Sequence, residues 1–274
     1  MKTLNRWNVA GGIRYFDQLF ELNHELMEFY GVDHNFFYSV FDSHPGLLWN
    51  GGRPLKPAPW SLEASMQMIK KWNDMGVGFN LTFTNVLLEK KHLMDTDCNM
   101  FLEECHDSMN SIVVSSEILR AYIRENYPKY QIKCSISLNR QDKAFYIKAE
   151  QLYDRVVIAP DLNKDLELLS SLESEKIEIL VNEPCLKNCS YKEEHFRKIS
   201  QYNLDCPRYF KGENPLLCIY PNHSKDLYLE YDDIKRLNKL GIRMFKIQGR
   251  QGSWEFLRSA IKEYIEKDWV RRER

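Results

Sequence analysis

The sequence predicts a closed (β/α)8 barrel with an N-terminal helix, forming a single domain over residues 1–274. Eight short apolar runs alternate with helix-like stretches, and most runs are rich in Val, Ile and Phe, as strands buried on both faces are. Strands and helices that alternate with short connections favour parallel strands and right-handed crossovers. Eight such units are enough to close a barrel. An open, doubly wound sheet is the alternative, because runs of uneven strength could conceal a miscount.

The expected elements follow one another in a regular order. A leading helix is expected around residues 13–30, before the first strand. The eight expected strands are Phe36–Phe41, Gly78–Phe83, Ser111–Ser115, Gln131–Leu138, Arg155–Ala159, Lys176–Val181, Leu217–Tyr220 and Arg243–Ile247. Ser61 is the expected N-cap of a helix over residues 62–75, and a second amphipathic helix over residues 229–240 ends at Gly241.

Composition and charge exclude several classes of protein. The formal net charge of −1 gives no long-range attraction to nucleic acid or to an anionic membrane. The sequence has no apolar stretch near the roughly 18 residues of a membrane span, and its start lacks the apolar region of a secretory signal. The sequence therefore predicts a cytoplasmic protein without a membrane partner. In a reducing compartment its seven cysteines are expected to be buried thiols or metal ligands.

Polar residues follow every expected strand, where the loops of such a barrel carry its chemistry. His44 and His223 could act as acid or base near neutral pH, although a loop histidine is more often simply solvated. Arg250, like Arg140, could bind a carboxylate or phosphate, or form a salt bridge across the mouth. Glu183 could be a catalytic carboxylate, support a metal ligand or cap a helix. His44, Glu183, His223 and Arg250 are the candidate catalytic residues.

Four cysteines fall in one short stretch with the pattern C-x3-C-x16-C-x11-C: Cys185, Cys189, Cys206 and Cys218. Two adjacent strand–helix units could bring four thiolates around one iron–sulfur cluster, because a metal centre fixes ligand geometry and not sequence spacing. Four thiolates equally suit structural zinc, and two or more of these residues could be buried thiols. Of the remaining cysteines, Cys134 is expected to pack in the core, and Cys98 and Cys105 are expected to pack in the core or to be partly exposed.

The sequence lacks the motifs of two familiar classes of enzyme. Radical S-adenosylmethionine enzymes carry C-x3-C-x2-C, but the third position here is Lys192. The chain has no G-x-S-x-G or H-E-x-x-H motif for a hydrolase, and His195 lies at the wrong spacing in Glu193-Glu194-His195. A long Gly- and Pro-rich loop between Trp49 and Trp60 could form a lid over the mouth, or pack over the barrel edge.

Two segments resemble a known family. The stretch FKIQGRQGSWEFLRSAIKEYI (245–265) resembles the last strand and following helix of the peptidase U32 family, also called collagenase-like proteases. Lys246, Gly249 and Arg250 match its motif, whereas Gln248 replaces the usual Glu. The stretch LVNEPCLKNCSYKEEHF (180–196) resembles the cysteine-bearing segment of the same family.

The resemblance implies a (β/α)8 barrel and, as in several members, a 4Fe–4S cluster on Cys185, Cys189, Cys206 and Cys218. It also implies an oxygen-independent hydroxylase, and not a peptidase, acting on a small aromatic or nucleobase-like substrate with an electron donor or protein partner. The alternatives from the residues are a non-catalytic or accessory barrel with a structural four-cysteine zinc site, and a metal-free hydrolase.

Overall fold

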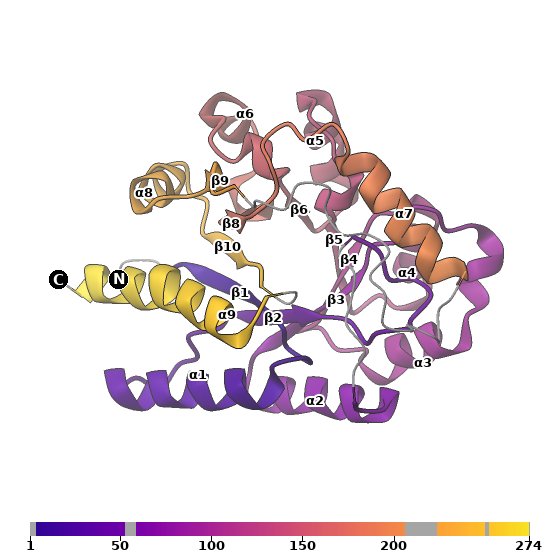
Figure 1. Cartoon of the computed structure of the whole chain (residues 1–274), viewed down its shortest axis with the longest axis horizontal. Coiled ribbons are helices and arrows are strands. Elements are labelled where there is room, and N and C mark those ends of the chain that lie inside the picture. The colour runs from indigo at the N-terminus through magenta and orange to yellow at the C-terminus, as the bar shows by residue number, and fades with distance from the viewer. Residues whose placement is uncertain (1–3, 53–58, 206–223, 250–251, 274) are drawn as a thin grey trace.

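Eight parallel strands close into a barrel in the computed structural model, which describes residues 4–52, 59–205, 224–249 and 252–273 (Figure 1). Around the barrel the strands follow one another in the order β1-β10-β7-β6-β5-β4-β3-β2, and neighbouring strands pair in parallel. The barrel strands are β1 (Arg6–Ala10), β2 (Ser39–Asp42), β3 (Gly78–Phe83), β4 (Ser111–Val114), β5 (Gln131–Cys134), β6 (Arg155–Val157), β7 (Ile177–Leu180) and β10 (Met244–Ile247). The predicted fold class is confirmed.

The first barrel strand is not the one that the sequence predicted. β1 pairs with β2 on one side and with β10 on the other, so it closes the barrel. Trp7 and Val9 belong to the buried core, whereas Asn8 between them contacts Ser39 on β2. The strand was missed because it has only two large apolar residues, which alternate with polar ones.

The predicted seventh strand is wrong in its place in the barrel. β7 pairs directly with β10, so no strand lies between them, and the predicted segment Leu217–Tyr220 is outside the described residues. Beyond β7 the chain instead forms a small antiparallel sheet of β8 (Asn182–Glu183) and β9 (Leu227–Tyr228). β8 begins two residues after β7, so this small sheet extends the chain beyond the carboxyl end of β7.

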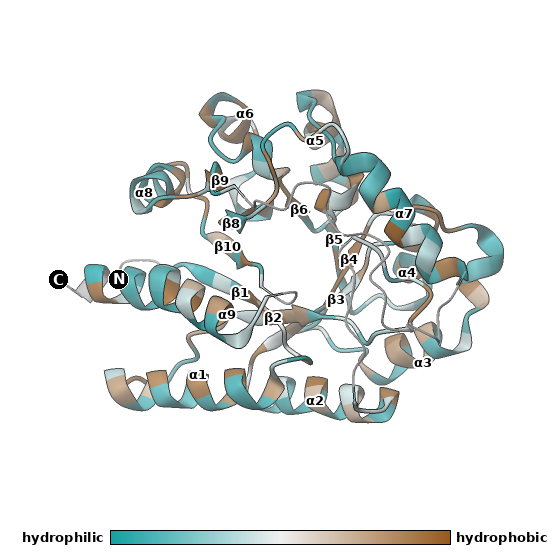
Figure 2. Cartoon of the chain, viewed as in Figure 1, coloured by the Kyte–Doolittle hydropathy of each residue, from teal (hydrophilic) through white to brown (hydrophobic). Residues whose placement is uncertain are grey.

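Helices surround the barrel strands. They are α1 (Phe16–Tyr30), α2 (Leu62–Asp74), α3 (Thr96–Glu104), α4 (Glu117–Asn126), α5 (Lys143–Leu152), α6 (Leu166–Ser170), α7 (Lys192–Asp205), α8 (Tyr231–Lys239), α9 (Trp254–Ile261) and α10 (Lys267–Glu273). Ser61 caps α2 as predicted, because its hydroxyl accepts a hydrogen bond from the Ala64 amide. The helices mix hydrophilic and hydrophobic residues, as expected where one face covers the barrel (Figure 2). No described helix is long and apolar enough to cross a membrane.

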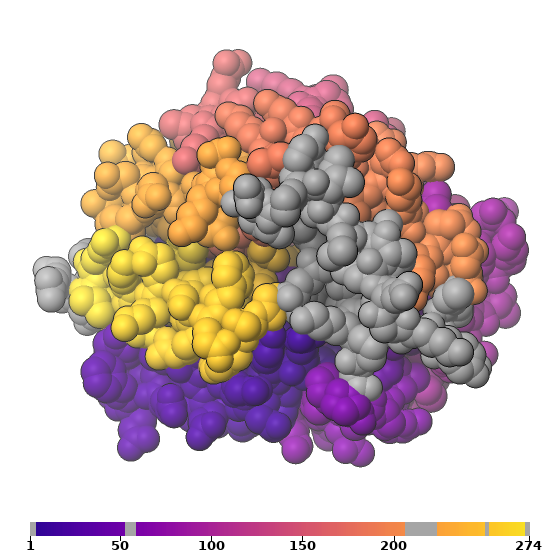
Figure 3. Space-filling view, viewed as in Figure 1, coloured from indigo at the N-terminus to yellow at the C-terminus, as the bar shows by residue number. Residues whose placement is uncertain are grey.

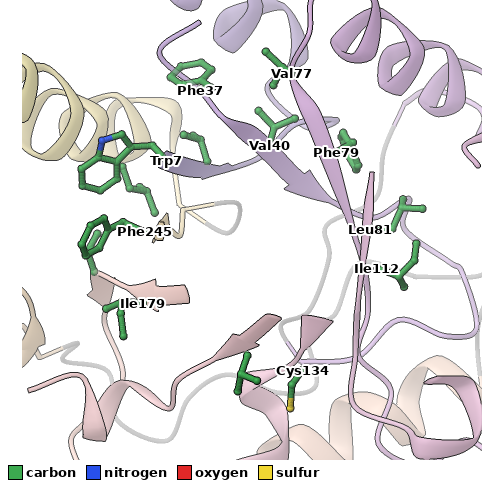
Figure 4. Close-up of a cluster of buried hydrophobic side chains, with 14 of the residues drawn as sticks. Trp7, Phe37, Val40, Val77, Phe79, Leu81, Ile112, Cys134, Ile179 and Phe245 are labelled. Carbon is green, nitrogen blue, oxygen red and sulfur yellow. The ribbon is translucent and has the colours of Figure 1, made fainter. Parts of the chain in front are cut away.

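The main core lies between the strands and the helices. Val40, Phe79, Ile112, Ile179 and Phe245 point outward from the ring of strands into this layer (Figure 4). Cys98, Cys105 and Cys134 are buried in the same core, which confirms the packing role predicted for them. Burial of this apolar surface supplies the main favourable term in folding.

The inside of the barrel is polar at its amino-terminal end. Asn80 on β3 donates to the Ser39 hydroxyl at 2.7 Å, and Ser39 donates to Asn8. All three side chains are buried. Most barrels of this kind fill their interior with branched apolar residues, so the hydrogen bonds here offset the cost of burying polar groups.

The two ends of the chain meet on one side of the barrel. Trp7 packs against Phe245 and against Tyr264, with ring centroids 5.3 and 6.2 Å apart. The C-terminal helices accordingly lie against the N-terminal segment, yellow beside indigo in Figure 3. Asn5 also donates to Asp268 of α10 at 3.1 Å. Closure of the barrel thus depends on contacts between the first and the last elements of the chain.

Candidate functional site

A pocket opens at the carboxyl ends of the barrel strands, the end at which barrel enzymes bind their substrates. It encloses about 620 Å³ of space between atoms, which includes open solvent. Residues from six barrel strands and from several segments beyond them line it, among them Phe41, Thr82, Glu183, Phe196, Lys246 and Gln248.

Three charged side chains lie together inside the barrel, below this pocket. The Lys133 ammonium on β5 donates to Glu178 Oε2 on β7 at 2.8 Å, and both side chains are 1% exposed. Lys246 Nζ on β10 lies 3.7 Å from Glu178 Oε1 and 4.0 Å from the centre of the Phe41 ring. We call Lys133, Glu178 and Lys246 the charged triad.

The triad keeps Glu178 ionised. Burial alone would raise the pKa of this carboxyl, but the nearby positive charges of Lys133 and Lys246 outweigh burial and lower it. A carboxylate that is paired on both oxygens can remain charged in a site from which water is largely excluded. Charges of both signs therefore lie inside the barrel below the pocket, and Lys246 is the member of the triad that also lines the pocket.

The cysteine-bearing loop begins next to the pocket. Glu183 on β8 is buried, lines the pocket, and accepts a hydrogen bond from the Cys185 amide at 3.0 Å. The side chains of Cys185 and Cys189 are half-buried on the loop between β8 and α7. Glu183 thus connects the pocket wall to the first of the two described thiol residues.

Asp161 fixes the far end of the same loop. It lies in the 3-10 helix η3 (Pro160–Leu162) after β6 and accepts hydrogen bonds from the Asn188 amide at 2.6 Å and from Lys192 Nζ at 2.5 Å. Burial would raise the pKa of Asp161, but these donors lower it overall, so the carboxylate stays ionised. Asn188 has a φ of 53°, in the left-handed region that Asn tolerates.

Helix α7 follows this loop and lies across the mouth of the barrel. Asn85, after β3, donates to the Ser200 carbonyl at 3.1 Å, and Ser200 Oγ accepts from the Val86 amide at 3.1 Å. Asn203 donates to the Asn50 carbonyl, after β2, at 3.0 Å. The Phe196 side chain of α7 lines the pocket, so the helix forms part of the pocket wall.

His44 does not lie among the residues that line the pocket. Its Nδ1 is 2.9 Å from the hydroxyl of Ser65 on α2, outside the ring of strands. Burial lowers the pKa of His44, more than the charges of Asp97 and Glu63 raise it. His44 is therefore placed away from Glu183, the other described candidate.

The structure describes only some of the remaining predicted site residues. Cys206, Cys218, His223 and Arg250 are outside the described residues. Arg140 is exposed, with its guanidinium 5.8 Å from the centre of the Phe145 ring. Within the described ranges, no group of three or more His, Cys, Asp or Glu side chains could hold a metal ion.

For the loop between Trp49 and Trp60, which could form a lid or pack at the barrel edge, the structure shows where Trp49 lies. Trp49 is fully buried, its Nε1 donates to the His92 carbonyl at 2.7 Å, and its ring packs edge-on against Phe83. The alternative of packing at the barrel edge therefore describes Trp49. Residues 53–58 of the loop are outside the described residues.

Sequence reasoning did not single out Lys133, Glu178 or Asp161. For the first two a signal was present, because each is a charged residue inside an otherwise apolar run, QIKC and IEIL. A charge in a strand buried on both faces must point into the barrel or against a helix. Asp161 gave no such signal, since an acidic residue after a strand is ordinary.

Comparisons with known proteins agree with this architecture. No family model matches the chain. A curated relative from Methanocaldococcus jannaschii, named "Uncharacterized protease MJ1657", is 22% identical over 246 residues, covering 85% of this chain and 73% of the relative. A xylose isomerase domain containing protein from Salmonella typhimurium aligns with 97% of this chain at 11% identity and a TM-score of 0.49.

The solved structure of the U32 peptidase Mk0906 superposes with a TM-score of 0.61 at 12% identity, covering 89% of this chain and 92% of that protein. At this identity the superposition shows a shared fold, and the sequence match to the archaeal relative is independent of it. The superposition thus shows that this chain shares the barrel fold of a U32 peptidase, and the archaeal protein is similar to this chain in sequence.

Proposed function

We propose that this chain is a redox enzyme that binds a small substrate in the barrel mouth, beside an iron–sulfur cluster held by Cys185, Cys189, Cys206 and Cys218. The observation that carries the proposal is the position of Glu183. Its carboxylate lines the pocket and also accepts the Cys185 amide, so the thiol loop starts at the pocket wall.

The two described thiols fit such a group in donor type and in placement. Clusters take thiolate ligands, and Cys185 and Cys189 are half-buried on one short loop. Asp161 and Glu183 hold the two ends of that loop by hydrogen bonds to backbone amides. A loop held in this way keeps its ligands in place, as hydrogen-bonded supports of metal sites do. When bound, the cluster would supply one-electron transfer.

The pocket itself suits a small, flat, partly polar substrate. Phe41 and Phe196 offer aromatic surface, while Thr82 and Gln248 offer hydrogen-bonding groups and Lys246 a positive charge. Such a wall can stack on a ring and orient its polar substituents. We therefore propose an oxygen-independent hydroxylase acting on an aromatic or nucleobase-like compound.

The names of the two relatives point instead to peptide hydrolysis. A serine–histidine pair does occur, since His44 Nδ1 lies 2.9 Å from Ser65 Oγ. However, Ser65 is fully buried and its hydroxyl also donates to the Ser61 carbonyl, so a peptide cannot reach it. We expect no hydrolysis of casein or gelatin by the purified chain, and cleavage that persists through repeated purification would favour the peptidase.

The metal content of protein purified without oxygen tests the proposal. We expect brown protein with about four irons per chain and matching acid-labile sulfide. The double variant C185S/C189S should lose the iron. The matched control is Cys105→Ala, because Cys105 is a buried core residue at the end of α3 and is not on the thiol loop. Colourless protein with one zinc per chain would replace this proposal by a structural zinc site.

A further inference from the structure

Among the described residues, Lys133, Lys192 and Lys246 are the buried lysines, and of these three Lys246 lines the mouth pocket. Lys246 is only 9% exposed and lies beside an ion pair that is complete without it. Lys133 occupies one oxygen of Glu178 at hydrogen-bond distance, whereas Lys246 Nζ lies 3.7 Å from the other. That distance is longer than a hydrogen bond, so a small movement of the amine would bring it within hydrogen-bond distance of Glu178.

The environment of Lys246 favours a reactive amine. A lysine becomes nucleophilic when it is desolvated and placed near another cation, because both effects favour the neutral amine. Lys246 on β10 is nearly buried. Lys133 on β5 contacts the same Glu178 carboxylate from the opposite side of β7. Glu178 provides an ionised carboxylate whose Oε1 lies 3.7 Å from Lys246 Nζ, so a small movement would be needed for proton transfer.

If the charged triad had only a structural role, its burial would cost free energy of folding. Two ammonium groups and one carboxylate in a barrel interior must be desolvated, and apolar residues of similar volume would often be as stable. Such arrangements of charged groups in a cleft are typical of functional sites. The pocket that Lys246 lines also has polar side chains, Gln248, Ser135 and Ser137, of the type that can donate hydrogen bonds to a carbonyl oxygen.

We propose that Lys246 forms an imine with the carbonyl carbon of a small aldehyde or 2-oxo acid bound in the mouth pocket. The ammonium of Lys246 first gives a proton to Glu178. The neutral nitrogen then attacks the carbonyl carbon, a C–N bond forms, and a second N–H proton moves to the carbonyl oxygen. The new hydroxyl takes the proton back from Glu178 and leaves as water, which gives a protonated imine. No electrons are gained or lost.

Lys133 has a separate part in this step. Its ammonium stays on Glu178 Oε2 and holds that carboxylate in place while the other oxygen exchanges a proton with Lys246. Lys133 is therefore a positioning residue. The step uses no thiol, so the inference does not depend on the iron–sulfur cluster.

Reductive trapping tests the inference on the full chain. The protein is incubated separately with glyoxylate, pyruvate and glycolaldehyde in the presence of sodium borohydride, and adducts are mapped by peptide mass spectrometry. With at least one probe we expect the adduct on Lys246 to exceed that on Lys70 by about 100-fold, the lower end of what a positioned proton-transferring group contributes. Lys70 is the matched control because its side chain is 78% exposed.

Two variants sharpen the result. Lys246→Arg keeps the charge but cannot form the imine, and it should lose the dominant adduct. Glu178→Gln should lower the yield at Lys246 by at least about tenfold, because no carboxylate then accepts the proton. If either variant fails to fold, the adduct site in the unmodified chain still decides the question. Adducts spread evenly over exposed lysines with all three probes would overturn the inference.

Discussion

Glu178 is the residue on which the charged triad depends, since its two oxygens face Lys133 and Lys246. We expect Glu178→Gln to lower the free energy of unfolding by about 3–5 kcal/mol, because it leaves Lys133 buried without a counter-charge. Urea unfolding followed by circular dichroism measures this. Glu175→Gln is the matched control: this residue is exposed beside the same strand, and its loss should cost less than about 0.5 kcal/mol. Equal midpoints for the two variants would contradict the account.

The lowered pKa of Glu178 also sets a pH dependence. A carboxyl whose folded pKa is below its unfolded value of 4.5 contributes stability that is fully present above pH 4.5. That contribution is lost as the pH falls through the folded pKa. We therefore expect the stability difference between the unmodified chain and Glu178→Gln to shrink below pH 4.5. A difference that is constant down to pH 3 would show that Glu178 does not titrate as described.

The roles of some single residues could be predicted from the sequence, and the roles of others could not. Ser61 as a helix cap and the buried Cys98, Cys105 and Cys134 follow from local patterns, and the structure confirms them. Asp161 does not, because its partner Asn188 lies 27 residues later in the chain. A hydrogen bond between two loops depends on the tertiary fold and leaves no local pattern.

Among the elements, α7 is the one that distinguishes the mouth of this barrel. Hydrogen bonds to the loops after β2 and β3 attach it, together with the Lys192–Asp161 pair at its start and the buried side chains of Phe196 and Ile199. Such a helix can open without unfolding the strands beneath it, because local opening requires fewer contacts to break than global unfolding.

Ser200→Ala tests this attachment. The variant leaves the Val86 amide without its acceptor, which costs about 1–3 kcal/mol locally. We expect faster amide hydrogen exchange in α7 and unchanged exchange in the barrel strands. Gln201→Ala, at the next and exposed position of the helix, should leave exchange as it is. If strands β3 and β4 exchange faster together with α7, the helix is part of the main cooperative unit.

The strands show both the reach and the limit of sequence patterns. The run GFNLTF predicts β3 residue by residue, because Phe79, Leu81 and Phe83 recur at every second position. β1 was missed, since its interior-facing position is the polar Asn8 and only Trp7 and Val9 mark it as a strand. The total of eight was right only because one predicted strand, Leu217–Tyr220, was wrongly placed in the barrel.

For the whole molecule, closure of the barrel joins the first strand to the last elements of the chain. Trp7 on β1 packs against Phe245 and Tyr264 at this seam. We expect Trp7→Ala to lower the free energy of unfolding by about 3–5 kcal/mol, as truncation of a buried aromatic residue does. The control is Phe29→Ala, because Phe29 is 79% exposed. A loss for Trp7→Ala no larger than for the control would mean that β1 is not needed for closure.

The fold class could be predicted from the sequence because strand burial and strand–helix alternation are local patterns repeated along the chain. The site could be predicted only in part. Glu183 was placed correctly at the mouth, since it follows a strand, whereas His44 turns toward α2 and away from the pocket. The direction in which a loop side chain points depends on its neighbours in the folded structure, and these neighbours cannot be read from the sequence.

X-ray absorption at the iron and zinc edges of anaerobically purified protein tests the central claim most directly. The account predicts an iron edge with sulfur neighbours and iron–iron scattering, lost in the C185S/C189S variant. A zinc edge with four sulfur neighbours, or no bound metal in protein that is folded and pure, would contradict it.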